Sequence, residues 1–272
     1  MSGTGVERAA WVRFRAAAGH GGFGRLEADA VHEYAGDVFD SPRPTGAVLA
    51  ASALTLLAPC MPTKIVALWN NFHALAAKIG KAAPAHPLYL LKPASSVIGP
   101  HERIERPLRY AGKIAFEGEL GIVIGRRCHG VPPAEAEQYI FGYTCVNDVT
   151  AIGVMTENAD FTQWCRSKGH DTFGCLGPAI VPRLDWRAAS VVTRLDGVER
   201  QRYALADMIF APAELVSLIS HDMTLMPGDV IACGTSLGVG SIPDGATVEV
   251  TIDGLGSLAN TLGSGPRTAA PA

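Results

Sequence analysis

Residues 116–125, Phe-Glu-Gly-Glu-Leu-Gly-Ile-Val-Ile-Gly, place two acidic side chains inside an apolar, β-branched segment that ends on a glycine. This composition predicts a buried β-strand. Because residues two apart on a strand face the same way, Glu117 and Glu119 are expected to project together from one face. Two neighbouring carboxylates resist burial, so they either lie at a solvated strand end or hold a cation. Oxygen-only ligands suit Mg²⁺, Mn²⁺ or Ca²⁺.

The composition is that of a globular protein that needs no membrane. The chain has 272 residues, of which 48% are hydrophobic and 18% charged, so it can bury a full core. A net charge of −3 provides no basic field for nucleic acid or for an acidic membrane. No apolar run reaches membrane-spanning length, and the first five residues lack the order of a secretory signal. The six cysteines are scattered, which favours reduced thiols in a cytoplasmic protein.

The first part of the chain is predicted to form short strands separated by turns. Residues 11–15 alternate apolar and basic side chains, glycines recur over 19–24, and 31–40 resemble another strand. We therefore expect residues 1–62 to form a small β-rich subdomain, in which no constellation of catalytic groups is evident. Residues 63–272 form the larger domain, which carries the acidic pair.

The larger domain alternates strand-like segments with short helices. An alanine-rich helix is expected to end near Lys78, and Asp196-Gly197 is a hairpin signal. Helices are further predicted over residues 132–139 and 212–220, and strands over 64–68, 88–91, 140–148, 191–195, 230–233, 247–252 and 255–260. A tail that looks disordered follows the last strand.

Three further features are compatible with either a site or a plain structural role. Asp148 ends an almost wholly apolar strand, as an exposed cap or as a third metal ligand. Residues 153–172 are polar and irregular, as in a surface connection or an active-site wall. The loop 234–240, Gly-Thr-Ser-Leu-Gly-Val-Gly, is either a tight turn or a cradle in which Thr235 and amides hold a small carboxylate. It lacks the lysine of a P-loop and the spacing of a dinucleotide fingerprint.

Taken in order, these motifs resemble the fumarylacetoacetate hydrolase family over roughly residues 64–262. The segments that carry the resemblance are 90–93, 116–120, 142–150, 164–173, 207–210, 227–231 and 234–240. The resemblance implies a mixed α+β, β-rich fold: a β-roll of mixed sheets with short helices, following the small N-terminal subdomain. It also implies one Mg²⁺ or Mn²⁺ per subunit, a homodimer, and a small-molecule 2-oxo or 1,3-diketo acid as substrate.

The resemblance also assigns roles to individual residues. It places Glu117, Glu119 and Asp148 on the family's three metal ligands. It places Lys168 on the active-site lysine and Thr235 on the threonine that helps to hold the substrate.

Two further residues are expected to bind substrate. Gly234 belongs to the same glycine loop, and Lys92 lies within the matching segment 90–93.

One part of the family pattern is different here. Hydrolytic members typically have Asn-Tyr-x-x-His with a glutamate three residues later, and this pair activates water. If Asn71-Phe72 takes the place of Asn-Tyr, Leu75 and Lys78 occupy the positions of the pair. His73 then serves as the base only if the lid is shifted, and otherwise is a helix-surface histidine. His170 is a second candidate base.

Hydrolysis of a C–C bond in an acylpyruvate-type substrate is therefore the first expectation for the reaction. Decarboxylation or isomerisation and tautomerisation of a 2-oxo acid is the alternative, because neither needs an activated water. A lyase or hydratase of aromatic-compound catabolism and a non-catalytic homologue are the remaining readings. Substrate specificity is expected to depend on residues 69–80 and 153–163.

Overall fold

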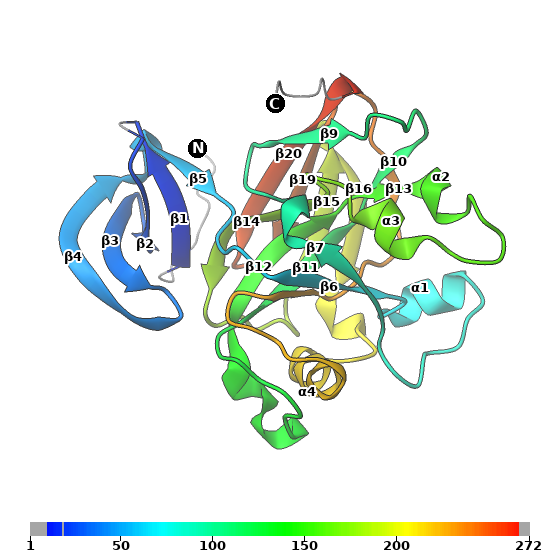
Figure 1. Cartoon of the computed structure of the whole chain (residues 1–272), viewed down its shortest axis with the longest axis horizontal. Helices are drawn as coiled ribbons and strands as arrows, with labels where there is room; N and C mark the ends of the chain where they lie inside the picture. Colours follow the sequence, from blue (N-terminus) through cyan, green and yellow to red (C-terminus); the bar gives the residue numbers. More distant parts are fainter. Residues whose placement is uncertain (1–9, 18, 267–272) are drawn as a thin grey trace.

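The computed structural model describes residues 10–17 and 19–266, and strands dominate them (Figure 1). The helices are α1 (His73–Lys78), α2 (Ile152–Met155), α3 (Trp164–Lys168) and α4 (Pro212–Asp222), with 3₁₀ turns η1 (Ala51–Ala53), η2 (Ala94–Ser96), η3 (Pro133–Tyr139) and η4 (Leu205–Asp207). The strands are β1 (Ala10–Ala16), β2 (Gly21–Glu27), β3 (Ala30–Asp37), β4 (Asp40–Ala50), β5 (Leu54–Leu57), β6 (Lys64–Trp69), β7 (Leu88–Pro93), β8 (Val97–Ile98), β9 (Arg103–Arg106), β10 (Ile114–Phe116), β11 (Gly118–Ile124), β12 (Ile140–Asp148), β13 (Thr150–Ala151), β14 (Gly174–Val181), β15 (Ser190–Leu195), β16 (Val198–Ala204), β17 (Val230–Ala232), β18 (Gly240–Ser241), β19 (Thr247–Ile252) and β20 (Gly256–Pro266).

The largest sheet runs through both parts of the chain. Its strand order is β4-β3-β2-β1-β14-β12-β11-β17-β6-β7, with β5 paired to β1 and β8 to β14. Strands β1 to β4 form a curved lobe beside the main body (Figure 1), and β1 joins it to β14 by antiparallel pairing of Trp11 with Ile180. The N-terminal strands therefore extend the main sheet. The division of the chain at residue 62 stays a prediction.

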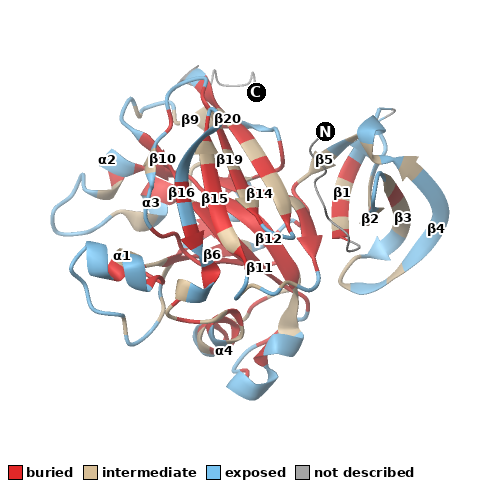
Figure 2. Ribbon diagram, turned by 180° about the vertical axis from the view of Figure 1, so that it is seen from behind, coloured by how far each residue is buried: buried red, intermediate tan, exposed pale blue. Residues whose placement is uncertain are grey.

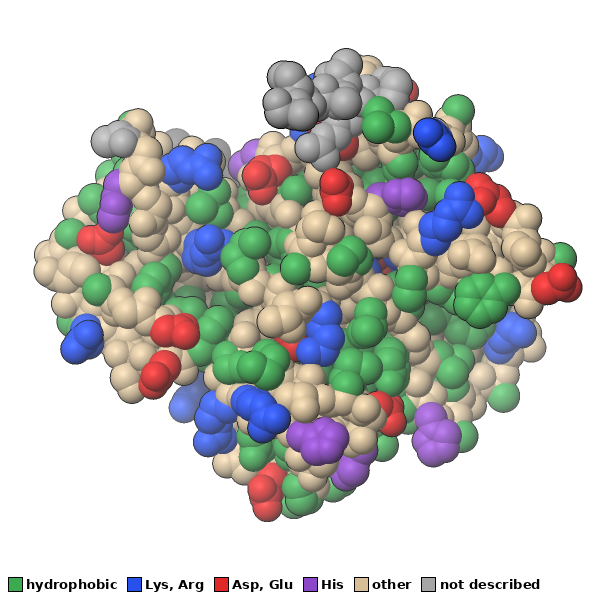
Figure 3. All heavy atoms as spheres, viewed as in Figure 1, with side chains coloured by type: hydrophobic (Ala, Val, Ile, Leu, Met, Phe, Trp, Pro, Cys, Tyr) green, Lys and Arg blue, Asp and Glu red, His purple; other side chains and the backbone are tan. Residues whose placement is uncertain are grey.

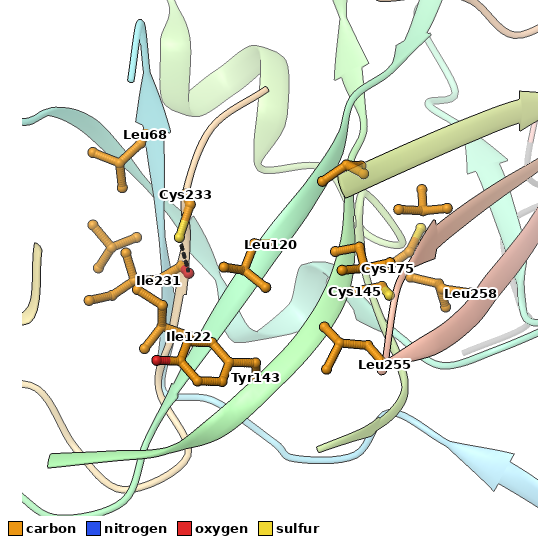
Figure 4. Packing of buried hydrophobic residues seen from close by; sticks show 14 of the residues in the cluster. Leu68, Leu120, Ile122, Tyr143, Cys145, Cys175, Ile231, Cys233, Leu255 and Leu258 are labelled. Carbon is orange, nitrogen blue, oxygen red and sulfur yellow. Dashed lines mark hydrogen bonds between the residues drawn. The ribbon is translucent and has the colours of Figure 1, made fainter. Parts of the chain in front are cut away.

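Two smaller sheets complete the roll: β16-β15-β19-β20-β9, and the short β13-β10-β18. Buried residues run along β11, β12, β14 and β15 at the centre of the main body (Figure 2). In the close view, Leu120 and Ile122 of β11 lie beside Ile231 and Tyr143, while Leu258 lies beside Cys175 and Cys145 (Figure 4). Val123 of β11 and Val146 of β12 face the other way and belong to a second buried cluster, so the two strands are covered on both faces.

The β-rich fold with mixed sheets and short helices is confirmed, and so is the helix at 212–220, which extends to Asp222. The single strand predicted over 116–125 is wrong, because the chain breaks at Glu117. Strand β10 before the break pairs with β13 and β18, whereas β11 after it joins the large sheet. The break places Glu117 at a junction between two sheets.

Four other segments differ from the sequence-based expectation. Residues 133–139 form a 3₁₀ turn where an α-helix was predicted, and two short helices lie within 152–168. Strand β4 was missed because it carries prolines, which an edge strand tolerates. Strand β20 continues to Pro266 because it pairs with β9 as well as β19, so the tail was predicted to begin too early; 267–272 lie outside the described residues.

None of the helices within residues 10–17 and 19–266 combines the length and apolar character needed to cross a membrane.

Candidate metal centre

Three carboxylates meet where β11 and β12 lie side by side. One oxygen from each of Glu117, Glu119 and Asp148 lies within 4.8 Å of the others. Strands β11 and β12 pair antiparallel with Gly118 opposite Asn147, so the start of one strand lies beside the end of the other. The convergence expected from the sequence is therefore present in the fold.

Glu119 is the most deeply buried member of this cluster, with 0% of its surface exposed. Its Oε2 accepts a hydrogen bond from the Gly234 N–H at 2.8 Å, whereas Oε1 is buried without a partner in the described part of the chain. Burial raises the pKa of Glu119 well above its usual range, and the nearby charges of Asp148 and Glu117 raise it further. A buried acceptor without a donor, beside two more carboxylates, is suited to a cation.

Lys168 supplies positive charge to the cluster from the last position of α3. Its Nζ lies 2.7 Å from Glu117 Oε1 and 2.6 Å from Asp148 Oδ2, and the residue is only 4% exposed. Burial disfavours the ammonium, but the carboxylates of Asp148 and Glu117 outweigh it and raise the pKa of Lys168. The lysine is therefore charged at neutral pH.

Lys92 of β7 reaches the same cluster from the opposite side of Asp148. Its ammonium is fully buried, pairs with Asp148 Oδ1 and contacts Val149 O at 3.3 Å. Burial raises the pKa of Asp148, but Lys168 and Lys92 lower it more, so this carboxylate is ionised. The expected substrate-binding role of Lys92 stays a prediction, since its observed partner is a candidate metal ligand.

The glycine loop is tied to the strand that carries Glu119. Gly234 has a φ of +85°, a conformation that favours glycine, and its N–H binds the Glu119 carboxylate. The Thr235 hydroxyl donates to Gly118 O at 3.1 Å and accepts from Gln201 Nε2 at 2.9 Å. Both residues thus position the acidic strand, and their predicted contact with substrate is untested.

Sequence reasoning missed three polar residues of this site. The Thr150 hydroxyl bridges Lys168 and Glu117, with both distances 2.7 Å. Gln201 accepts from the Gly118 N–H at 3.1 Å, and the Tyr203 hydroxyl donates to Gly118 O. The signal for the last two was weak: they are the alternate, buried positions of an otherwise exposed hairpin strand.

The two candidate bases lie in different surroundings. His73 is the exposed first residue of α1, and no hydrogen bond joins it to the three carboxylates among residues 10–17 and 19–266. His170 is half-buried against Phe173, with ring centroids 5.1 Å apart, and its Nε2 lacks a partner among the described residues. Burial lowers the pKa of His170, and Arg166 adds to this effect, so its ring is neutral at pH 7.

Comparison with known proteins assigns the chain to a family. The model named "Fumarylacetoacetate (FAA) hydrolase C-terminal" matches residues 64–263, and one named "Rv2993c-like, N-terminal" matches residues 10–59. The chain belongs to the fumarylacetoacetate hydrolase family. The resemblance that the motifs indicated is thereby confirmed.

Relatives within this family include hydrolases and isomerases. The protein Rv2993c of Mycobacterium tuberculosis is 41% identical over 233 residues, 85% of this chain and 86% of its own. A 2-hydroxyhepta-2,4-diene-1,7-dioate isomerase from Mycobacterium marinum superposes with a TM-score of 0.85 at 36% identity, covering 94% of this chain and 98% of that one. A maleylpyruvate hydrolase from Sphingobium sp. SYK-6, solved with manganese(II) and pyruvate, has a TM-score of 0.75 at 24% identity, covering 94% and 100%, and shares the fold.

Proposed function

We propose that the chain is a divalent-metal-dependent enzyme that cleaves a C–C bond of an acylpyruvate-type 2-oxo acid by hydrolysis. The observation that carries the proposal is the arrangement of Lys168 against Glu117 and Asp148, beside the partnerless buried oxygen of Glu119. A cation site next to a charged lysine is suited to a substrate that develops negative charge.

The three carboxylates are proposed to hold one Mg²⁺ or Mn²⁺ per subunit. Their all-oxygen donor set fits either ion, and the maleylpyruvate hydrolase structure contains manganese(II). When bound, such an ion supplies Lewis-acid stabilisation of charge on the keto oxygen of the substrate.

The remaining roles belong to side chains of this chain. In hydrolysis, the oxygen of water adds to the acyl carbon and the bond from that carbon to C3 of the pyruvate unit breaks. The electron pair stays on the pyruvate unit, where the Lys168 ammonium stabilises it until C3 takes up a proton. Lys92, Thr235 and Gly234 are proposed to orient the substrate, and His73 or His170 to accept the proton of water.

A second candidate, isomerisation or decarboxylation of a 2-oxo acid, is favoured by the surroundings of α1. Leu75 and Lys78 take the positions expected for the water-activating pair, and His73 is exposed. Neither reaction needs an activated water. The isomerase from Mycobacterium marinum is also among the more similar solved structures.

Proton NMR on metal-stripped protein separates these candidates. Acetylpyruvate and oxaloacetate are each followed before and after Mg²⁺ is added, with Glu119→Gln as the variant lacking a proposed ligand. Acetate plus pyruvate that form only with metal support hydrolysis. Pyruvate from oxaloacetate alone, or proton exchange without cleavage, supports the second candidate. No metal-dependent change, together with no rise in melting temperature on adding Mg²⁺ and oxalate, indicates a non-catalytic homologue.

We also propose a homodimer in the cytoplasm, without nucleic-acid or membrane partners, on the family resemblance and the net charge of −3. Light scattering after size exclusion tests this: a mass of one chain contradicts the dimer.

A further inference from the structure

A cavity of about 530 Å³ opens at one end of the β6–β7 hairpin. Its lining residues carry no charged side chain: Trp69, Pro87, Leu88, Tyr89, Leu90 and Trp164. The indole rings of Trp69 and Trp164 lie 5.8 Å apart at 51°. Hydrophobic side chains also gather on the face that Figure 3 shows, near the area where Figure 1 draws β6 and α1. The volume is within the range of small-ligand pockets.

The strand register links this cavity to the carboxylate cluster. Four directly paired residues form a row across the large sheet: Gly121, Ala232, Ala67 and Leu90. Paired residues share a face, and side chains alternate along a strand. Glu119, Trp69 and Leu88 are each two residues from a member of this row, so they stand on its face.

The glycine loop lies between Glu119 and β6, the strand that ends on Trp69. Gly234, which binds Glu119, lies so close to β6 that a Cβ there would be 3.2 Å from Leu68 O, next to Trp69. Glycine at this position, with its φ of +85°, lets the loop approach both Glu119 and the strand that carries Trp69.

Helix α3 makes a second connection. Trp164 begins this helix and Lys168 ends it, so they are one turn apart on the same side, a rise of roughly 6 Å. Likewise, Lys92 follows Leu90 by two residues on β7, roughly 7 Å along the strand. Both lysines that contact Asp148 are thus mounted on elements whose other ends line the cavity.

We infer that this cavity receives the distal group of the substrate and selects an apolar chain or ring. The inference rests on the proposed function, since it assumes that the oxo acid group binds at the carboxylate cluster. A largely apolar lining gains from burying methylene groups, and it offers a second carboxylate no positive charge. The preferred substrates are therefore 2-oxo acids with one carboxylate and an alkyl or aryl end.

The test uses unreactive mimics of a 2-oxo acid on Mg²⁺-loaded protein. Calorimetric titrations compare three compounds: oxamate, N-hexyl oxamate, and an N-hexyl oxamate whose chain ends in a carboxylate. Tryptophan fluorescence is a second readout. The hexyl compound should bind at least about tenfold more tightly than oxamate, since each buried methylene contributes roughly fourfold. The carboxylate-ended analogue should lose most of this gain.

Two arginine variants on strand β7 test whether the cavity itself is responsible. Leu88 is 41% exposed and lines the cavity, whereas Leu91 is 38% exposed and points to the other face of β7. Leu88→Arg should weaken the hexyl compound and strengthen the carboxylate-ended one, each about tenfold. Leu91→Arg should change neither.

The outcomes distinguish a failure of the proposed function from a failure of this inference alone. Failure of oxamate itself to bind in the presence of Mg²⁺ overturns the proposed function, and this inference with it. Binding of oxamate with no gain from the hexyl chain overturns the inference alone. So does an equal response of the two arginine variants.

Discussion

Replacing Glu119 by glutamine should make the metal-free protein more stable and the metal-loaded protein less responsive to metal. Among the described residues, Glu119 has one satisfied oxygen, on the Gly234 N–H, and one buried oxygen without a partner. A glutamine can keep the first contact through its carbonyl. Its amide group can then donate to the neighbouring carboxylates of Glu117 and Asp148, which lie within 4.8 Å.

The size of the effect follows from that unsatisfied oxygen. Leaving one buried acceptor without a donor costs about 1–3 kcal/mol, which corresponds to a melting temperature about 2–10 °C higher for the variant. Mg²⁺ at about 100 times its dissociation constant should stabilise the unmodified protein by about 2.7 kcal/mol. Even the loss of a residue that only supports a metal ligand weakens metal binding about 10–100-fold. Loss of a ligand itself should weaken it more, so the same Mg²⁺ should stabilise Glu119→Gln by less than about 0.5 kcal/mol.

Thermal unfolding followed by circular dichroism, with EDTA and with Mg²⁺, measures both quantities at pH 7. Glu137→Gln, an exposed position in η3, is the matched control and should change neither. A lower melting temperature for metal-free Glu119→Gln would refute the reasoning about the buried oxygen. An undiminished response to Mg²⁺ would show that Glu119 is not a ligand.

Three other substitutions and one control test different parts of the structure. Asp229→Ala should lower the free energy of unfolding in urea by about 3 kcal/mol, because it leaves a paired lysine and several backbone donors unsatisfied; Asp244→Ala, in an exposed ion pair, should cost under about 1 kcal/mol. Gly118→Ala should cost about 1–3 kcal/mol in the same assay, since its Cβ would lie 2.1 Å from Thr193 Oγ1. Lys168→Met should reduce kcat about 100–1,000-fold while the melting temperature still rises with Mg²⁺, and an unchanged kcat would remove the lysine from the mechanism.

Local patterns singled out the three acids, and the family resemblance joined them into one predicted metal site. Glu117 and Glu119 stand out because carboxylates are rare in a buried strand, and Asp148 because it ends an apolar one. Glu119 and Asp148 meet through the antiparallel pairing of β11 with β12, whereas Glu117 joins them from the break between β10 and β11. Such a pairing is short-range enough for sequence reasoning to anticipate.

The charge balance of the site was less accessible to prediction. That Lys92 pairs with Asp148 depends on how β7, at the edge of the large sheet, lies relative to the end of β12, which no local pattern encodes. Gln201 and Thr235, which are 34 residues apart in the sequence, meet through a tertiary contact that local patterns do not encode either. The break at Glu117 was missed because strand propensity continues through it, and only the competing pairing of β10 with β13 and β18 decides it.

The attachment of β1 to β14 has a consequence for how the chain tolerates truncation. Within the large sheet, β1 occupies the side of β14 that β12 leaves free, and Trp11 covers Phe141 with their rings 6.4 Å apart. A chain shortened to begin near residue 60 would uncover both an unpaired strand edge and an aromatic patch. Exposed edges of this kind invite pairing with other chains. The N-terminal lobe therefore protects this sheet edge from pairing with other chains. A shortened chain would need another cover for the edge in order to resist aggregation.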